Sequence, residues 1–285
     1  TRATGALVLL AALAQLSVYH RKSVLPFVLG ALPVPLFIAA YNFYYFGSPL
    51  SFAQELIGHT IAIEKTGSPA LWQTPLWKGA LGLLVSPSRG LLIFSPVLVP
   101  AFFGVARVFK QKEWHSLRPF AGAALLMMAT QCKWFDWWGG HAYGYRPWLD
   151  AVPYLVLCLL PVMGSIKETA TRRAAFGVAF GWSIFVQALG ALTYDRFWNV
   201  RQLFVVRAPE LVEPKGLFTE AEAQEYASVH HGNYLGPTFC DIDYPFCRFR
   251  LWSLEDNMIL YQFTHFEETR GRRLPMGYDE LGTHP

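Results

Sequence analysis

The sequence predicts an all-α polytopic membrane protein with about six transmembrane helices, interfacial outer-face helices and a small α+β outer tail. Composition is the first reason, because 53% of the 285 residues are hydrophobic and only 15% are charged. A soluble domain carries about 25% charged residues. The second reason is a series of long apolar runs, and the third is the distribution of lysine and arginine between them. Positive charge scattered in this way also argues against nucleic-acid binding, which needs a basic face.

Six apolar runs have lengths that suit membrane-spanning helices, each of which needs about 20 residues. They are Ala3–Tyr19, Val24–Phe46, Leu91–Phe109, Pro119–Phe135, Trp148–Gly164 and Ala174–Leu192. Several contain proline, which membrane helices tolerate when their neighbours satisfy the freed backbone groups. The alternative is a set of buried helices in a large soluble protein, but the runs lack the polar stripe that such helices show.

Basic residues divide the loops between these runs into two groups that alternate along the chain. His20–Ser23, Arg107–Arg118 and Ser165–Arg173 hold nine Lys and Arg residues, whereas the longer segments Gly47–Gly90 and Lys133–Pro147 hold five. The positive-inside rule places the first group in the cytoplasm and the second group outside. We therefore expect a multi-pass protein in contact with membrane lipid, whose C-terminal tail lies outside.

The first outer segment, Gly47–Gly90, contains two amphipathic stretches that suit helices lying in the membrane interface. These stretches are Phe52–Ile63 and Trp77–Val85. Glu55 and His59 are one helical turn apart, so they share a face and are candidates for a pocket. The segment ends in the turn Ser86–Gly90, which carries Arg89 before the third apolar run.

The second outer segment, residues 133–148, concentrates side chains of the kinds that bind ligands and carry chemistry. Its candidates are Asp136, Trp137, Trp138, His141, Tyr143, Tyr145 and Arg146. Tryptophan faces suit sugar rings, and a carboxylate beside an imidazole can assist proton transfer. Arg146 and Arg89 would suit a phosphate at headgroup depth, because the guanidinium fork matches phosphate oxygens.

Each of these residues also has a plain structural interpretation. Both arginines can extend to lipid headgroups as ordinary boundary residues. Asp136 can pair with Lys133 or Arg146, and the tryptophans can form an interfacial belt. The sequence leaves the two interpretations open.

Residues 193–285 form the predicted outer tail, as opposed to the transmembrane bundle of residues 1–192. The tail holds nine Lys and Arg against 14 Asp and Glu, whereas the bundle holds 15 against six. A helix is expected after Thr219, because Glu222 completes a capping box. Strands are expected at Leu203–Val206, around Trp252 and at Met258–Phe263.

The four cysteines fall into two classes. Cys132 and Cys158 lie in apolar runs and are expected as small buried hydrophobic residues. Cys240 and Cys247 lie in the tail, where an oxidising compartment would allow a disulfide between them. The alternative for this second pair is two free thiols.

No familiar soluble-enzyme motif occurs, whether a P-loop, a dinucleotide fingerprint, a serine-hydrolase elbow or a zinc motif. A metal site could be drawn in the tail from His230, His231, Asp241 and Asp243. These residues show no standard ligand spacing, so we expect no metal among them.

Three stretches occur in an order that is informative: Tyr41–Asn42 with Phe46–Leu50, Gly82–Leu92 with Ser95–Pro96, and Trp138–Arg146. Together they resemble the later part of bacterial GT-C glycosyltransferases of the family-39-like kind. These polytopic, lipid-carrier-dependent enzymes are related to protein O-mannosyltransferases and to the aminoarabinose transferase of lipid A. The resemblance covers roughly residues 24–161.

The resemblance implies sugar transfer at the outer face of the bacterial cytoplasmic membrane. A polyprenyl-phosphate sugar is the donor substrate, and transfer to an acceptor inverts the anomeric carbon. The catalytic acidic residue of that family lies in an earlier outer loop, so no catalytic residue is assigned here and we expect missing N-terminal spans. Arg89 and Arg146 match motif arginines. The resemblance does not decide whether a divalent metal takes part.

The alternative function is a non-catalytic membrane scaffold or accessory subunit that binds a partner through the acidic outer tail. A transporter is disfavoured, because it would need ionisable groups at mid-membrane and the interiors of the second, third and sixth runs have none.

Overall fold

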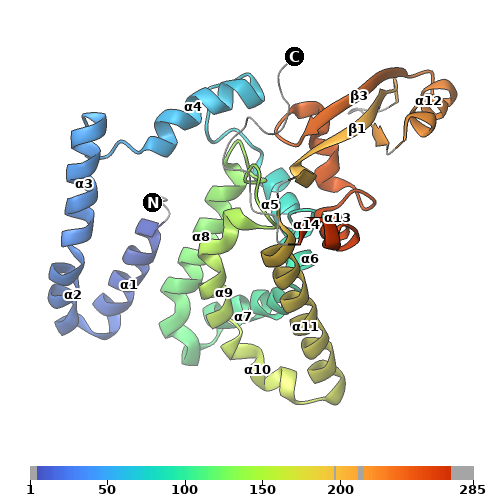
Figure 1. The fold of residues 1–285 in the computed structure, drawn as a ribbon. Helices are drawn as coiled ribbons and strands as arrows, with labels where there is room; N and C mark the ends of the chain where they lie inside the picture. Colours follow the sequence, from blue (N-terminus) through green and yellow to red (C-terminus); the bar gives the residue numbers. More distant parts are fainter. Residues whose placement is uncertain (1–4, 196, 211–214, 218, 271–285) are drawn as a thin grey trace. The chain divides into compact units, whose positions relative to one another are not determined.

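The computed structural model describes residues 5–195, 197–210, 215–217 and 219–270, and it is mostly helical with one small β-sheet (Figure 1). Two helical segments are long and apolar enough to cross a membrane, Arg21–Phe46 with 26 residues and Ala170–Thr193 with 24. A third is counted if Arg146–Leu157 and Leu160–Lys167, which meet at 62°, form one bent span. By length and composition, the described residues thus contain two or three such spans and not the expected six.

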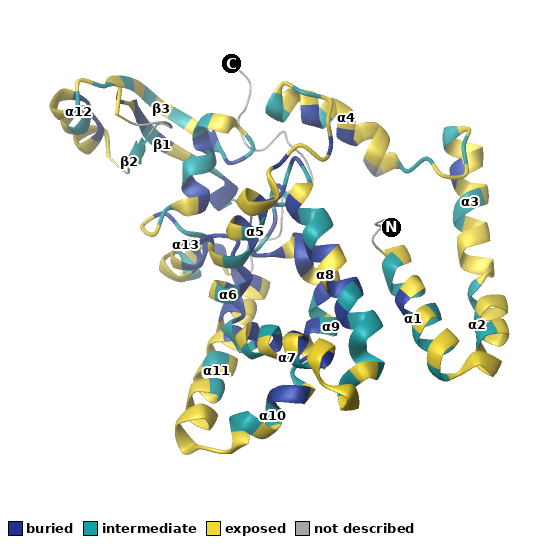
Figure 2. Ribbon diagram, turned by 180° about the vertical axis from the view of Figure 1, so that it is seen from behind, coloured by how far each residue is buried: buried dark blue, intermediate teal, exposed yellow. Residues whose placement is uncertain are grey.

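The N-terminal helices are α1 (Gly5–Tyr19), the short 3-10 helix η1 (Arg21–Ser23), α2 (Val24–Ala31) and α3 (Pro33–Phe46). Helix α1 has 15 residues, which gives about 22 Å of length against a hydrocarbon core of about 30 Å. Much of α2 and α3 is exposed (Figure 2), and Phe37 has 71% of its surface accessible. Exposed apolar helices of this kind suit contact with lipid.

Two helices form in the first outer segment where the sequence predicts them, α4 (Ala53–Thr66) and α5 (Leu76–Val85). Helix α4 ends at Gly67, whose φ of 73° lies in the left-handed region that glycine adopts without strain. Helix α5 brings its buried Gly79 against the backbone of Cys132, where a larger side chain would not fit.

Two of the three middle apolar runs, Leu91–Phe109 and Trp148–Gly164, are divided into shorter helices, chiefly at prolines. The elements of this region are α6 (Leu91–Phe94), η2 (Pro96–Leu98), α7 (Val99–Lys110), η3 (Lys112–Leu117), α8 (Arg118–Lys133), η4 (Arg146–Ala151), α9 (Val152–Leu157) and α10 (Leu160–Lys167). Proline lacks an N–H and its ring clashes with the preceding turn, so α7, α9 and α10 each have a proline in the first turn. Helix α8 is continuous but has only 16 residues.

The C-terminal part begins with α11 (Ala170–Thr193) and contains the sheet. The remaining elements are η5 (Phe197–Asn199), β1 (Val200–Arg207), β2 (Lys215–Leu217), α12 (Glu220–Val229), β3 (Asn233–Asp241), η6 (Pro245–Trp252), α13 (Met258–Thr264) and α14 (Phe266–Thr269). The strands are antiparallel in the order β2-β1-β3. Side chains of β1 alternate, because Leu203 and Val205 pack with the two tail cysteines while Val206 packs under α12.

Two predictions for the tail are confirmed and one is wrong. The Leu203–Val206 stretch is a strand, and Thr219 and Glu222 form the capping box of α12. The strands expected around Trp252 and at Met258–Phe263 are instead the helices η6 and α13. The reason for α13 is local, since the Asn257 side chain accepts a hydrogen bond from the Leu260 amide and caps the helix.

The described chain forms two compact units that interleave along the sequence. The first combines the residues up to Leu83 with Pro96–Trp138 and Pro147–Ala179. The second combines Leu84–Ser95, Gly139–Arg146 and the chain from Phe180 onward. The expected boundary at residue 192 therefore lies inside the second unit, and the tail folds together with two short segments from the predicted bundle.

Candidate functional site

The segment 133–148, in which the sequence concentrates candidate residues, is shared between the two units. Asp136, Trp137 and Trp138 belong to the first unit. The other four candidates, His141, Tyr143, Tyr145 and Arg146, belong to the second. The two groups are therefore described separately.

In the first unit the paired tryptophans are buried. Trp137 and Trp138 have only 3% and 1% of their surfaces exposed, and their rings meet edge to face with centroids 5.8 Å apart. Trp137 lies against Gly82 of α5, which has no side chain to obstruct it. Such burial leaves no open face for a sugar ring, contrary to the expected platform.

Asp136 in the first unit forms an ion pair that the sequence interpretation did not include. Its Oδ2 lies 3.1 Å from Nζ of Lys65, at the end of α4. The same ammonium lies 5.9 Å from the centroid of the Trp138 ring. Lys65 therefore connects α4 to residues 136–138, through an ion pair with Asp136 and a cation–π contact with the Trp138 indole.

The other candidates in the first unit, Glu55 and His59, are both exposed on α4. His59 Nδ1 lies 2.7 Å from the Pro69 carbonyl oxygen, within the same outer segment. The buried side of α4 is formed instead by Gly58, which approaches Leu71 and Trp134, and by Ala62.

In the second unit Arg89 is a buried structural residue. It has no exposed surface, and its guanidinium donates to the carbonyl of Gly140 at 3.2 Å and to Asn199 Oδ1 at 3.0 Å. Ser86 of the same turn donates to the Leu251 carbonyl at 2.5 Å. A side chain enclosed in this way connects three segments of the unit and does not face a lipid phosphate as expected.

Tyr143 and Tyr145, like Arg89, make hydrogen bonds that connect segments of the second unit. The Tyr143 hydroxyl donates to the Val186 carbonyl at 2.8 Å, and the Tyr145 hydroxyl lies 2.6 Å from Ser95 Oγ. Burial raises the pKa of both phenols above its ordinary value. Both hydroxyls therefore stay protonated near neutral pH and position the segment without acting as bases.

Two candidates remain accessible. Arg146 is exposed at the first residue of η4. His141 keeps 22% of its side-chain surface accessible and follows Gly139 and Gly140, whose φ angles of 80° and 63° only glycine adopts readily.

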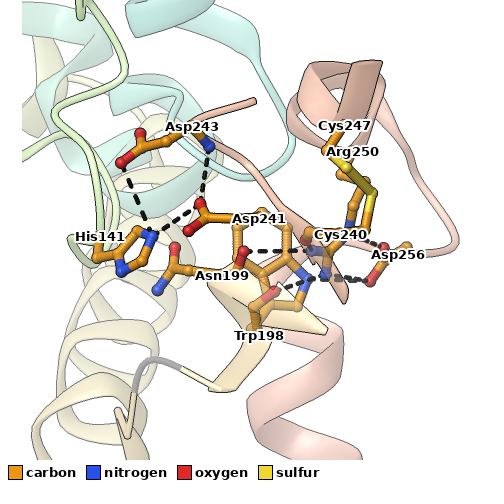
Figure 3. Close-up of a disulfide and its surroundings, with 9 residues drawn as sticks. All are labelled: His141, Trp198, Asn199, Cys240, Asp241, Asp243, Cys247, Arg250 and Asp256. Carbon is orange, nitrogen blue, oxygen red and sulfur yellow. Dashed lines mark hydrogen bonds and ion pairs between the residues drawn. A yellow bond between two sulfur atoms is a disulfide. The ribbon is translucent and has the colours of Figure 1, made fainter. Parts of the chain in front are cut away.

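His141 meets two carboxylates from the far end of the second unit. Its Nε2 lies 2.8 Å from Asp241 Oδ1 and 3.8 Å from Asp243 Oδ2 (Figure 3). Asp241 is the last residue of β3, and its Oδ1 also accepts a hydrogen bond from the Asp243 amide at 2.8 Å. The three ligand atoms lie within 4.8 Å of one another.

From the sequence alone we consider these two aspartates only together with His230 and His231, and we expect no metal among those four residues. His230 instead lies 2.6 Å from Glu210, and His231 occupies a turn with φ of 50°. The partner of Asp241 is His141, 100 residues earlier in the chain. No local spacing signals such a pairing, so only the tertiary structure could reveal it.

A second buried arginine, Arg250, holds the main chain directly before Asp241. Arg250 donates to the Cys240 carbonyl at 2.8 Å and the Trp198 carbonyl at 2.6 Å, and its Nε lies 2.6 Å from Asp256 Oδ2 (Figure 3). Cys240 and Cys247 are joined by a disulfide. These residues were not singled out in the sequence, apart from the cysteines, because nothing local marks Arg250 and Asp256 as a buried pair.

Comparison with protein-family models, with curated proteins and with solved structures finds no match for this chain.

Proposed function

We propose that the chain is part of a membrane glycosyltransferase that uses a polyprenyl-phosphate sugar at the outer face of a bacterial cytoplasmic membrane. One observation carries the proposal. Five residues of the second unit lie in the stretches that resemble the family. Arg89, Tyr143 and Tyr145 make hydrogen bonds that hold the unit together. His141 and Arg146 remain accessible. A framework that holds selected polar groups open to a ligand is typical of binding sites.

Arg146 is the residue to which we assign the carrier phosphate. It is exposed and directly precedes a proline in η4, at the edge of an apolar run. Its planar fork can donate two parallel hydrogen bonds to phosphate oxygens, which lysine cannot do. The sequence suggested that both Arg89 and Arg146 bind the phosphate. We assign it to Arg146 alone, because Arg89 is fully buried.

An apolar cleft in the same unit suits part of an isoprenoid chain. Its volume is about 590 Å³, within the usual range for ligand pockets. Aromatic and aliphatic side chains line it, including Trp182, Phe185, Ile93 and Phe263. The Trp182 indole donates to the Ile93 carbonyl at 2.8 Å and so fixes one wall.

The reaction that we propose is displacement at the anomeric carbon of the donor sugar. An acceptor hydroxyl loses its proton to a base and forms the new bond, while the polyprenyl phosphate leaves with the electrons of the old one. The family resemblance assigns that base to an earlier outer loop, so we give the role to no residue described here. The role assigned to the present residues is to bind and orient the carrier.

Binding of undecaprenyl phosphate tests this assignment. The purified chain in lipid nanodiscs is titrated with that lipid and, as a matched neutral control, with undecaprenol. Wild type should prefer the phosphate, and Arg146→Ala should bind it about 10- to 100-fold more weakly, the loss expected for hydrogen bonds to a charged group. Arg146→Lys should fall between the two, because it keeps the charge but loses the fork.

Arg172→Ala is the control variant, since Arg172 is also exposed but lies in the basic group expected on the cytoplasmic side. Its affinity for the phosphate lipid should equal that of wild type. Equal binding by Arg146→Ala and wild type would remove Arg146 from the site. Wild type without preference for the phosphate would contradict a carrier-dependent enzyme and favour the scaffold alternative.

A further inference from the structure

We propose that His141, Asp241 and Asp243 form a binding site for one divalent transition-metal ion, Zn²⁺ or Mn²⁺. The proposal concerns these three residues alone and does not depend on sugar transfer.

The donor set fits such an ion in kind. Imidazole nitrogen and carboxylate oxygen are both ordinary ligands of Zn²⁺, at about 2.0–2.2 Å. Mixed nitrogen and oxygen ligands of this sort suit first-row ions better than Ca²⁺ or Mg²⁺, which prefer oxygen throughout. A site with three protein ligands leaves one or more positions for water or a phosphate oxygen.

The spacing of the ligand atoms also fits. Ligands that surround one ion at about 2.1 Å lie roughly 3.0–3.5 Å from one another. The distances from His141 Nε2 are 2.8 Å to Asp241 Oδ1 and 3.8 Å to Asp243 Oδ2, on either side of that range. All three ligand atoms lie within 4.8 Å of one another, so they converge on one small volume.

Charge gives a reason why a cation would be held. Two carboxylates converge on one imidazole nitrogen, which has a single N–H to donate. The two carboxylate oxygens and the imidazole nitrogen lie within 4.8 Å of one another, and like charges at such a distance repel. A divalent ion replaces the Nε2 proton and neutralises both carboxylates. A plain ion pair of protonated His141 with the two aspartates is the competing explanation.

The ligands stand on a rigid framework, as a metal site requires. The disulfide between Cys240 and Cys247 encloses Asp241 and Asp243, and Arg250 holds the Cys240 carbonyl at 2.8 Å. On the histidine side, Arg89 binds the Gly140 carbonyl directly before His141.

Accessibility of the site is intermediate. Between 21% and 23% of each ligand side chain is exposed, so an ion and a further ligand can reach it from solvent.

Calorimetric titration of the purified full chain with Zn²⁺ and separately with Mn²⁺ tests the proposal. Wild type should bind one equivalent of at least one of these ions, and Ca²⁺ should not compete at equal concentration. His141→Ala and Asp243→Asn should each weaken binding at least 10-fold.

His230→Ala is the matched control, since His230 also pairs with a carboxylate, Glu210, but lies outside the site. Its affinity should equal that of wild type. Circular dichroism and disulfide mapping of each variant distinguish a lost ligand from a misfolded chain. The proposal is overturned if wild type binds neither ion, or if folded His141→Ala and Asp243→Asn bind as wild type does. The first of these results would identify the cluster as an ion pair alone.

Discussion

At the scale of single residues, the second unit is built around two arginines that the solvent does not reach. Arg89 and Arg250 have no exposed surface, and their guanidinium carbons lie 5.4 Å and 4.7 Å from the Trp198 ring centroid. Each donates to main-chain carbonyls of distant segments. Arginine suits this position because its flat, delocalised cation both stacks on an indole and supplies several donors at fixed angles.

Substitution of Arg250 should be strongly destabilising. Arg250→Met would leave Asp256, only 8% exposed, with Trp198 Nε1 at 3.0 Å and Arg201 at 3.4 Å but without its closest cation. Loss of one partner of a buried pair costs about 3–5 kcal/mol. Denaturant unfolding followed by tryptophan fluorescence measures the change.

Arg172→Met provides the comparison for Arg250→Met. Arg172 pairs with Glu168 at 2.6 Å, but the two side chains are 55% and 62% exposed. Solvent screens such a pair, so its loss should cost no more than about 0.5 kcal/mol. Equal costs for the two substitutions would mean that Arg250 is not the buried anchor described above.

At the scale of elements, close approach depends on glycine at a few helix positions. Helix α11 contains Gly181 and Gly190, which a sequence pattern cannot distinguish. Gly190 lies directly against the Tyr143 ring, so that an added Cβ would overlap it, whereas Gly181 has nothing within 4 Å. The same helix therefore carries one glycine that packing requires, Gly190, and two with open surroundings, Gly177 and Gly181.

Alanine substitutions at Gly190 and Gly181 should change stability in opposite directions. Gly190→Ala should destabilise by about 1–3 kcal/mol, since Tyr143 is also held by its hydrogen bond to Val186 and cannot move freely. Gly181→Ala should stabilise by up to about 1 kcal/mol through helix propensity. Thermal unfolding of both variants measures the difference, and a destabilised Gly181→Ala would contradict the open surroundings of that position.

At the scale of the whole molecule, two helical segments of the described chain are long and apolar enough to cross a membrane, and α11 is one of them. Helix α11 has 24 residues, which span about 36 Å and exceed a hydrocarbon core of about 30 Å. Arg172 and Arg173 lie in its first turn, and the disulfide-bearing tail follows its last. Disulfides persist in oxidising compartments, so this end should be the outer one.

Cysteine labelling in intact cells tests that orientation. Thr169→Cys, before α11, and Ser228→Cys, in α12, introduce single thiols at exposed positions. A membrane-impermeant maleimide should label Ser228→Cys alone, and both should react after lysis. The free native cysteines, Cys132 and Cys158, are buried and provide the background in wild type. Labelling of Thr169→Cys in intact cells would place both ends outside and exclude α11 as a span.

The sequence by itself determined the helical character, the two longest apolar segments, the short helices α4 and α5, the strand at Leu203–Val206 and the cap at Thr219. These features depend on local composition and hydrogen bonding. Only the tertiary structure decided which candidates are framework and which are accessible. Burial of Arg89 and Trp138, and the meeting of His141 with Asp241 across 100 residues, follow from contacts between distant segments. The residue types in a loop can suggest that it forms a binding or catalytic site. The partner of each side chain, however, often comes from a distant segment, and no local sequence pattern predicts it.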